Sequence, residues 1–244
     1  MITFARVDVG SGGLPVCPEC GDAPPLRTRP TADVIADVRR VVESWHEGPG
    51  PNVCFAGGDA FAHPELPSLV SETLRHGVER LRLTTAGPAL CQGLNAQGVI
   101  DAGVRHIEVV VVNLSGGIGA GAQVASLDSV LGGLGAFNEA ARTRGVRVAP
   151  VARVMTCPHT FAATPATVAA LASAGAVVVT VEFSGSASLG DEAWINAVID
   201  SGVVNRAWVQ FDAPSDRAAI QALTPLPGVD GGRARAWYEV GTRA

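Results

Sequence analysis

Two cysteines separated by two residues are the first feature of the chain that could do chemistry. In Cys17-Pro18-Glu19-Cys20-Gly21 this spacing lets two thiolates face one metal ion or cluster, with proline and glycine shaping the turn. A closed zinc site needs four ligands, and the five cysteines of the chain include no second pair at this spacing. The motif is therefore open to three interpretations: a zinc shared between two copies of the chain, a cluster with further ligands, or two unligated thiols.

A glycine pair followed by a carboxylate is the second feature. Gly57-Gly58-Asp59 comes directly after the apolar run at 52–56. Two glycines at a strand end let a ligand approach the backbone closely, and a neighbouring carboxylate can accept hydrogen bonds from an ammonium group. A plain turn between a strand and a helix fits the same residues.

Further polar residues stand near the ends of other apolar runs. Asn113 and Ser115 follow the run at 106–112, and both side chains can hydrogen-bond a ligand. Arg153 lies near the end of the run at 147–154, where it can bind a carboxylate through two hydrogen bonds or form an ion pair at the rim of the fold. Cys157 comes just after that run. Cys54, inside a run, is interpreted as a small apolar core residue.

The elements that must position these residues alternate regularly along the chain. Short β-branched runs predict strands, and the longer segments with helical periodicity between them predict helices. The expected strands are 2–9, 52–56, 80–85, 106–112, 147–154, 176–183 and 207–212. The expected helices are 31–47, 65–76, 92–102, 128–144, 165–174 and 191–201. This alternation is typical of an α/β fold with a parallel sheet, whose functional groups gather after the carboxyl ends of the strands.

Glycines predict where the helices end. Gly48, Gly77, Gly103, Gly145, Gly175 and Gly202 each follow or close a helical pattern. A left-handed residue commonly ends a helix, and glycine adopts that conformation without a steric penalty.

The order of these motifs resembles the radical S-adenosylmethionine (radical SAM) superfamily. Gly57-Gly58-Asp59 is similar to the Gly-Gly-Glu-Pro turn that ends the second strand in that family, and Thr84-Thr85-Ala86-Gly87 is similar to its Thr-Asn-Gly. The resemblance implies a partial (β/α)6-7 TIM-like barrel of the radical SAM type, a single domain over residues 1–223. Residues 224–244 would then form a C-terminal tail, as an edge strand or a docking segment.

The resemblance also implies a SAM site. Gly57, Gly58 and Asp59 would hold the amino group of SAM, Asn113 and Ser115 its ribose, and Arg153 its carboxylate. The family binds a [4Fe-4S] cluster through C-x3-C-x2-C, and Cys17 and Cys20 match the last two cysteines of that motif. Gly13 stands at the place of the first and offers no ligand.

Two functions follow from that departure. One is a non-radical relative, a pseudoenzyme or companion protein, that keeps a pocket for SAM, a substrate or a partner in a biosynthetic or modification pathway. The alternative is an active radical SAM enzyme that cleaves SAM to a 5′-deoxyadenosyl radical. Its cluster would be completed by Cys157, which we prefer, by Cys91 or His159, or by a partner chain.

Composition and charge exclude some classes of chemistry and of binding partner. The chain of 244 residues is 47% hydrophobic and 17% charged, which is typical of a folded protein. All 18 basic residues are arginine, so lysine-dependent chemistry such as Schiff-base formation is excluded. A net charge of −5 with scattered arginines predicts neither nucleic acid nor a membrane surface as partner. We expect a cytoplasmic protein that acts on SAM or a small molecule, alone or with a complete radical SAM enzyme or a peptide substrate.

Overall fold

The computed structural model describes residues 4–16, 24–46, 50–112, 126–183 and 192–212. Its helices are α1 (Thr31–Ser44), α2 (Leu66–Arg75), α3 (Gly93–Asp101), α4 (Leu127–Thr143), α5 (Thr164–Ser173) and α6 (Glu192–Val204). Its strands are β1 (Ala5–Gly12), β2 (Arg27–Thr28), β3 (Asn52–Gly58), β4 (Arg80–Thr85), β5 (His106–Val111), β6 (Ala149–Thr156), β7 (Val178–Phe183) and β8 (Trp208–Asp212). Short 3-10 turns are η1 (Ala60–Ala62), η2 (Pro88–Cys91) and η3 (Phe161–Ala163).

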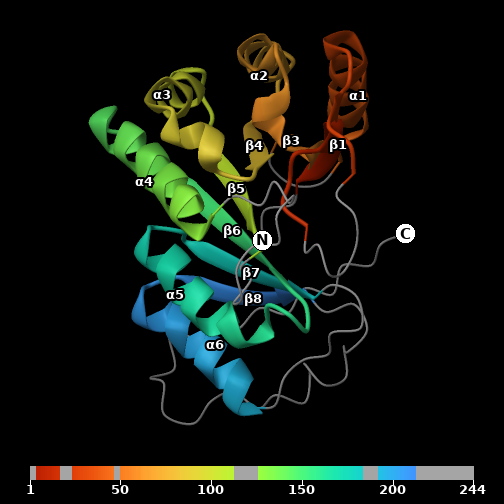
Figure 1. The fold of residues 1–244 in the computed structure, drawn as a ribbon. Coiled ribbons are helices and arrows are strands. Elements are labelled where there is room, and N and C mark those ends of the chain that lie inside the picture. The colour runs from red at the N-terminus through yellow and green to blue at the C-terminus, as the bar shows by residue number, and fades with distance from the viewer. Residues whose placement is uncertain (1–3, 17–23, 47–49, 113–125, 184–191, 213–244) are drawn as a thin grey trace.

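The strands form one sheet in the order β2-β1-β3-β4-β5-β6-β7-β8. Neighbours from β1 to β8 pair in parallel, and only the two-residue β2 runs antiparallel, beside the end of β1. Figure 1 shows the helices along one side of the sheet, which curves inside them. This is an α/β fold of the TIM-barrel-like kind, and among the described strands β2 and β8 are the two edges.

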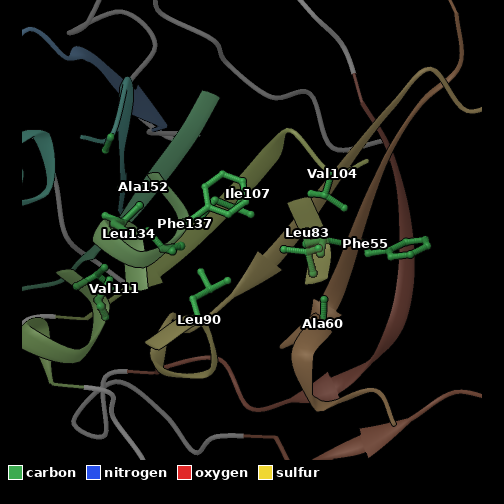
Figure 2. Packing of buried hydrophobic residues seen from close by; sticks show 14 of the residues in the cluster. Phe55, Ala60, Leu83, Leu90, Val104, Ile107, Val111, Leu134, Phe137 and Ala152 are labelled. Carbon is green, nitrogen blue, oxygen red and sulfur yellow. The ribbon is translucent and has the colours of Figure 1, made fainter. Parts of the chain in front are cut away.

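The hydrophobic core lies between the sheet and the helices. Alternate residues of a strand point to opposite faces, so one set from every strand faces the helical layer. Figure 2 shows part of this layer, where Leu83 and Ile107 of the sheet lie near Leu90, Leu134 and Phe137. Burial of such side chains stabilises the fold by roughly 25 cal/mol for each Å² of apolar surface removed from water.

The structure confirms the expected α/β alternation. All seven expected strands and all six expected helices are present, with ends within three residues of those expected. The antiparallel β2 was not expected. None of the described helices is long and apolar enough to span a membrane.

Four of the expected helix-ending glycines are confirmed. Gly77, Gly103, Gly145 and Gly175 have positive φ angles of 91°, 103°, 64° and 96°. The prediction for Gly202 is wrong, because α6 continues through it to Val204. The left-handed residue that follows α6 is Arg206, with φ 65°. Gly48 lies outside the described residues.

Candidate functional site

The inner face of the sheet, opposite the helices, holds a cavity of about 480 Å³. TIM barrels usually fill this space with branched apolar side chains, whereas here charged and polar groups enter it. The polar side chains of its lining are Arg6, Cys54, Arg82, Thr84, Glu108, Arg153 and Glu182. They come from β1, β3, β4, β5, β6 and β7, so the parallel sheet brings together residues far apart in the sequence.

One part of the cavity is positively charged. The register places Arg6 beside Cys54 and Cys54 beside Arg82. Arg6 forms an ion pair with Asp8 at 2.7 Å, so its charge is largely balanced. The guanidinium of Arg82 lies over the ring of Phe4, with 4.0 Å between its carbon and the ring centroid. Within the described residues Arg82 has no ion pair, and its buried Nε atom has no hydrogen-bond partner.

A second part of the cavity is built around Arg153. Its Nη2 donates to Oε1 of Glu108 at 2.9 Å, and its Nη1 donates to Oε2 of Glu182 at 2.7 Å. Burial works against the charge of Arg153, but the two carboxylates outweigh it and raise the pKa of the guanidinium. Three neighbouring strands, β5, β6 and β7, are thereby joined by one side chain.

A short hydrogen-bonded chain connects Glu108 to Cys54. The hydroxyl of Thr84 donates to Oε2 of Glu108 at 3.3 Å, and Sγ of Cys54 lies 3.5 Å from the same hydroxyl oxygen. Burial, followed by the nearby charge of Glu108, raises the pKa of the Cys54 thiol. Because only the thiolate is a strong nucleophile or metal ligand, this thiol is a weak one at neutral pH.

His106 packs on Phe4, which lines the cavity, and adds no charge there. Its ring meets Phe4 edge-on, with 5.6 Å between the centroids. Burial first, and then Arg82 and Arg80, lower the pKa of His106 to about 4. The ring is therefore neutral at neutral pH.

The predicted Gly-Gly-Asp turn lies at the end of β3, and its members take different roles. Gly57, with φ 83°, lines the cavity. Gly58 packs tightly on β1, where a Cβ would lie 2.8 Å from the carbonyl oxygen of Gly12. The carboxylate of Asp59 accepts hydrogen bonds within the protein, and its contact with a ligand ammonium stays a prediction.

Three protein donors occupy the Asp59 carboxylate. They are the backbone N–H groups of Phe61 and Ala86, at 2.9 and 3.0 Å, and the hydroxyl of Thr85, at 3.1 Å. Burial raises the pKa of this carboxyl, and the three hydrogen bonds oppose the rise. Asp59 therefore ties the end of β3 to the end of β4.

Gly13, expected at the place of a missing cysteine, is adjacent to this turn. Its φ is 75°, and a Cβ there would lie 3.1 Å from Cβ of Asp59. The backbone at this position thus favours glycine for a local steric reason.

Arg153 forms ion pairs, which was one of its two expected roles. Asn113, Ser115, Cys17 and Cys20 lie outside the described residues. Cys157, the expected third metal ligand, is 1% exposed and packs with Val112, while the hydroxyl of Thr160 donates to its sulfur at 3.7 Å.

The other two alternative ligands do not join Cys157 in a described metal site. Cys91 is exposed, and its thiol donates to the carbonyl oxygen of Ser129 at 3.2 Å. His159 is also exposed. No group of three or more His, Cys, Asp or Glu side chains in the described part of the chain could hold a metal ion. The metal-binding prediction is corrected for that part of the chain.

The sequence matches no family model and no curated protein. Among solved structures, a protein from Burkholderia cenocepacia J2315 assigned as a phosphonomutase is 15% identical, with a TM-score of 0.50 and 75% of each chain covered. The radical SAM methyltransferase TsrM from Kitasatospora setae is 14% identical, with a TM-score of 0.51 over 74% of this chain. This chain spans only 36% of the length of that enzyme. A 2,3-dimethylmalate lyase of the PEP mutase/isocitrate lyase superfamily is 11% identical, with a TM-score of 0.48 over 88% of this chain and 68% of that one.

These comparisons correct the radical SAM assignment. The fold is shared with a protein assigned as a phosphonomutase about as closely as with a radical SAM enzyme, at TM-scores of 0.50 and 0.51. Both functions expected from that assignment, the non-radical relative and the active radical enzyme, are corrected with it. Identities this low show a TIM-barrel-like α/β fold and nothing finer. SAM and a [4Fe-4S] cluster depended on that assignment and stay untested predictions.

Of the seven polar residues that line the cavity, six were not predicted as site residues from the sequence: Arg6, Cys54, Arg82, Thr84, Glu108 and Glu182. Their signal was a charged or polar residue at alternating positions within otherwise apolar strands, as in Leu81-Arg82-Leu83. Such alternation indicates a strand whose two faces meet different surroundings.

Proposed function

We propose that this protein binds a compact organic anion, a carboxylate or a phosphonate, in the cavity on the inner face of its sheet. Arg82 would anchor the anionic group. The observation that carries the proposal is the guanidinium of Arg82, which lines a cavity and has no carboxylate partner among the described residues. The fold would be a partial (β/α) barrel whose interior is a binding site.

The charges of the lining support an anion at Arg82. Asp8 forms an ion pair with Arg6, and Glu108 and Glu182 both form ion pairs with Arg153. Arg82 has no ion-pair partner among the described residues, and it lines a recess where burial weakens the competition from water. A guanidinium presents a planar fork of N–H donors that matches a carboxylate or phosphonate, and stacking on Phe4 would hold that fork in place.

The size and lining of the cavity fit a small molecule. Sites for small ligands commonly enclose about 300–1,000 Å³ and combine apolar walls with a few polar groups. Here Val110 and Met155 are apolar parts of the wall, and Phe4 covers Arg82. A phosphonate is one of the candidate ligands because a structurally similar protein is assigned as a phosphonomutase.

Calorimetric titration of the whole chain with pentanoate and with methylphosphonate tests the proposal. Arg82→Gln should weaken binding about tenfold or more, because a charge-assisted hydrogen bond contributes about 1.5–3 kcal/mol. Arg80→Gln is the matched control, since Arg80 is on the same strand but pairs with Glu79 and does not line the cavity. Circular dichroism confirms that both variants fold. Absence of binding to the wild type, or equal affinity in Arg82→Gln, would refute the proposed function.

A further inference from the structure

We propose that the anion bound in this cavity carries an apolar chain, so that the ligand is an amphipathic acid with one anionic group on a hydrocarbon chain of several carbons. This inference rests on the proposed function and specifies the class of ligand. The observation behind it is the arrangement of the lining along the strands. Arg82, the anchor for the anion, is on the side of the amino ends of the strands, and apolar side chains lie toward the carboxyl ends.

The strand register orders these residues along the cavity. Arg82 pairs with Cys54 on one side and with His106 on the other. Ala56 lies two residues beyond Cys54, and Val110 lies four residues beyond His106. At about 3.3 Å per residue, the backbones of Ala56 and Val110 are roughly 7 and 13 Å nearer the carboxyl ends of the strands than the backbone of Arg82.

The part of the cavity toward the carboxyl ends receives apolar side chains from several elements. Ala56 is on β3, Val110 on β5 and Met155 on β6, and the loop after β1 adds Leu14 and Pro15. We call these five residues the apolar wall. Leu14, Ala56 and Met155 are only partly buried, so apolar surface in the cavity is open to a ligand. Covering that surface with a hydrocarbon chain removes it from water, which is favourable.

The charged side chains beside the apolar wall contact one another. Glu108 and Glu182 both form ion pairs with Arg153. A second charged group on the ligand would compete with these existing ion pairs. A polar group placed against the apolar wall would lose its water without a hydrogen bond in return, which is unfavourable. A hydrocarbon chain avoids both costs.

Three acids with one carboxylate each test this inference at neutral pH: acetate, pentanoate and 3-methoxypropanoate. Pentanoate is titrated calorimetrically into the whole protein, and the other two are measured by their displacement of pentanoate. We expect pentanoate to bind about tenfold or more tightly than acetate, because each buried CH₂ group strengthens binding about three- to fourfold. The ether oxygen of 3-methoxypropanoate replaces one CH₂ group of pentanoate at equal length, so this acid should bind about threefold or more weakly than pentanoate.

Two variants test whether the chain lies against the apolar wall. Leu14→Gln and Met155→Gln each put a polar side chain of similar length into it, so the ratio of pentanoate affinity to acetate affinity should fall about threefold or more. Val204→Gln is the matched control, since Val204 is 79% exposed at the end of α6 and does not line the cavity. Circular dichroism confirms folding. Leu14 lies in a loop, so its variant gives the result even if Met155→Gln does not fold.

The two proposals fail in distinguishable ways. If Arg82→Gln weakens acetate and pentanoate alike but pentanoate binds no more tightly than acetate, the ligand has no apolar chain and the anion site stands. Equal affinity for pentanoate and 3-methoxypropanoate, or a preference for pentanoate that the folded wall variants leave unchanged, also overturns the inference. If no probe binds, both proposals fall.

Discussion

His106 makes the stability of the folded protein depend on pH. In the folded protein its pKa is lowered to about 4, chiefly by burial and then by Arg82 and Arg80. In the unfolded chain its pKa is near the ordinary value of about 6.5. Between these two values the unfolded state binds more protons, so stability falls as the pH falls. The contribution is complete above about pH 6.5 and is lost toward pH 4.

His106→Gln should remove this dependence. Between pH 7 and pH 4.5 we expect the wild type to lose about 1–2 kcal/mol more unfolding free energy than the variant, less than the full shift implies because the ring is partly exposed. Urea unfolding at both pH values measures the difference, with the exposed His46→Gln as control. Parallel pH profiles for wild type and His106→Gln would contradict this role.

At the scale of elements, two glycines in α4 show how packing against a neighbouring segment decides whether a helix position can carry a side chain. A Cβ on Gly133 would lie 2.4 Å from the carbonyl oxygen of Gly87, where α4 crosses η2. Gly135 lies two residues further along α4 and is exposed, and a Cβ there would meet nothing within 4 Å. Helix propensity favours alanine at both sites, but contact with a neighbouring backbone opposes it at the first.

Alanine substitution at these two glycines should therefore have opposite effects. We expect Gly133→Ala to lower the unfolding free energy by about 1–3 kcal/mol and Gly135→Ala to raise it by about 0.5–1 kcal/mol. Urea unfolding of the two variants against the wild type gives both values. Equal effects would mean that α4 does not approach η2 as described.

The order of elements could be predicted from the sequence because each depends on a local pattern. Runs of β-branched residues predicted every strand except β2. Glycines predicted four helix ends, where the structure shows positive φ angles. The end of α6 could not be predicted, because it depends on a tertiary contact. Gly202 is inside that helix, where a Cβ would lie 2.2 Å from Cγ2 of Val209 on β8. Close helix-to-strand packing, rather than a helix end, explains this glycine.

The cavity was harder to predict than the fold. The sequence indicated functional residues in loops after strands, and of these Asp59 accepts three hydrogen bonds within the protein and stays an untested prediction as a ligand contact. The polar residues of the cavity lie within strands instead. Which face of a strand is covered by helices decides whether an arginine there points to solvent or into a cavity, and that follows only from the assembled sheet. Gly57 and Arg153 are the predicted site residues that line the cavity.

For the molecule as a whole, Arg153 is the charge that lets the sheet keep two carboxylates on its inner face. Glu108 is on β5 and Glu182 on β7, and both reach the guanidinium on the strand between them. Replacing Arg153 with methionine keeps an apolar stem but removes the guanidinium that both carboxylates contact. The two carboxylates then repel each other, and each disfavours ionisation of the other.

Arg153→Met should lower the unfolding free energy at neutral pH by about 2–3 kcal/mol, below the value for a fully buried pair because the arginine is partly exposed. Protonation of the carboxylates relieves the repulsion, so this loss should shrink as the pH falls toward 4.5. Arg144→Met, which breaks the surface pair with Asp101, should lower the unfolding free energy much less, because solvent screens an exposed ion pair. Adding Glu108→Gln and Glu182→Gln to Arg153→Met should recover part of the loss, and urea unfolding of these variants measures each step. If the added substitutions recover nothing at neutral pH, repulsion between Glu108 and Glu182 is not the cause of the loss in Arg153→Met.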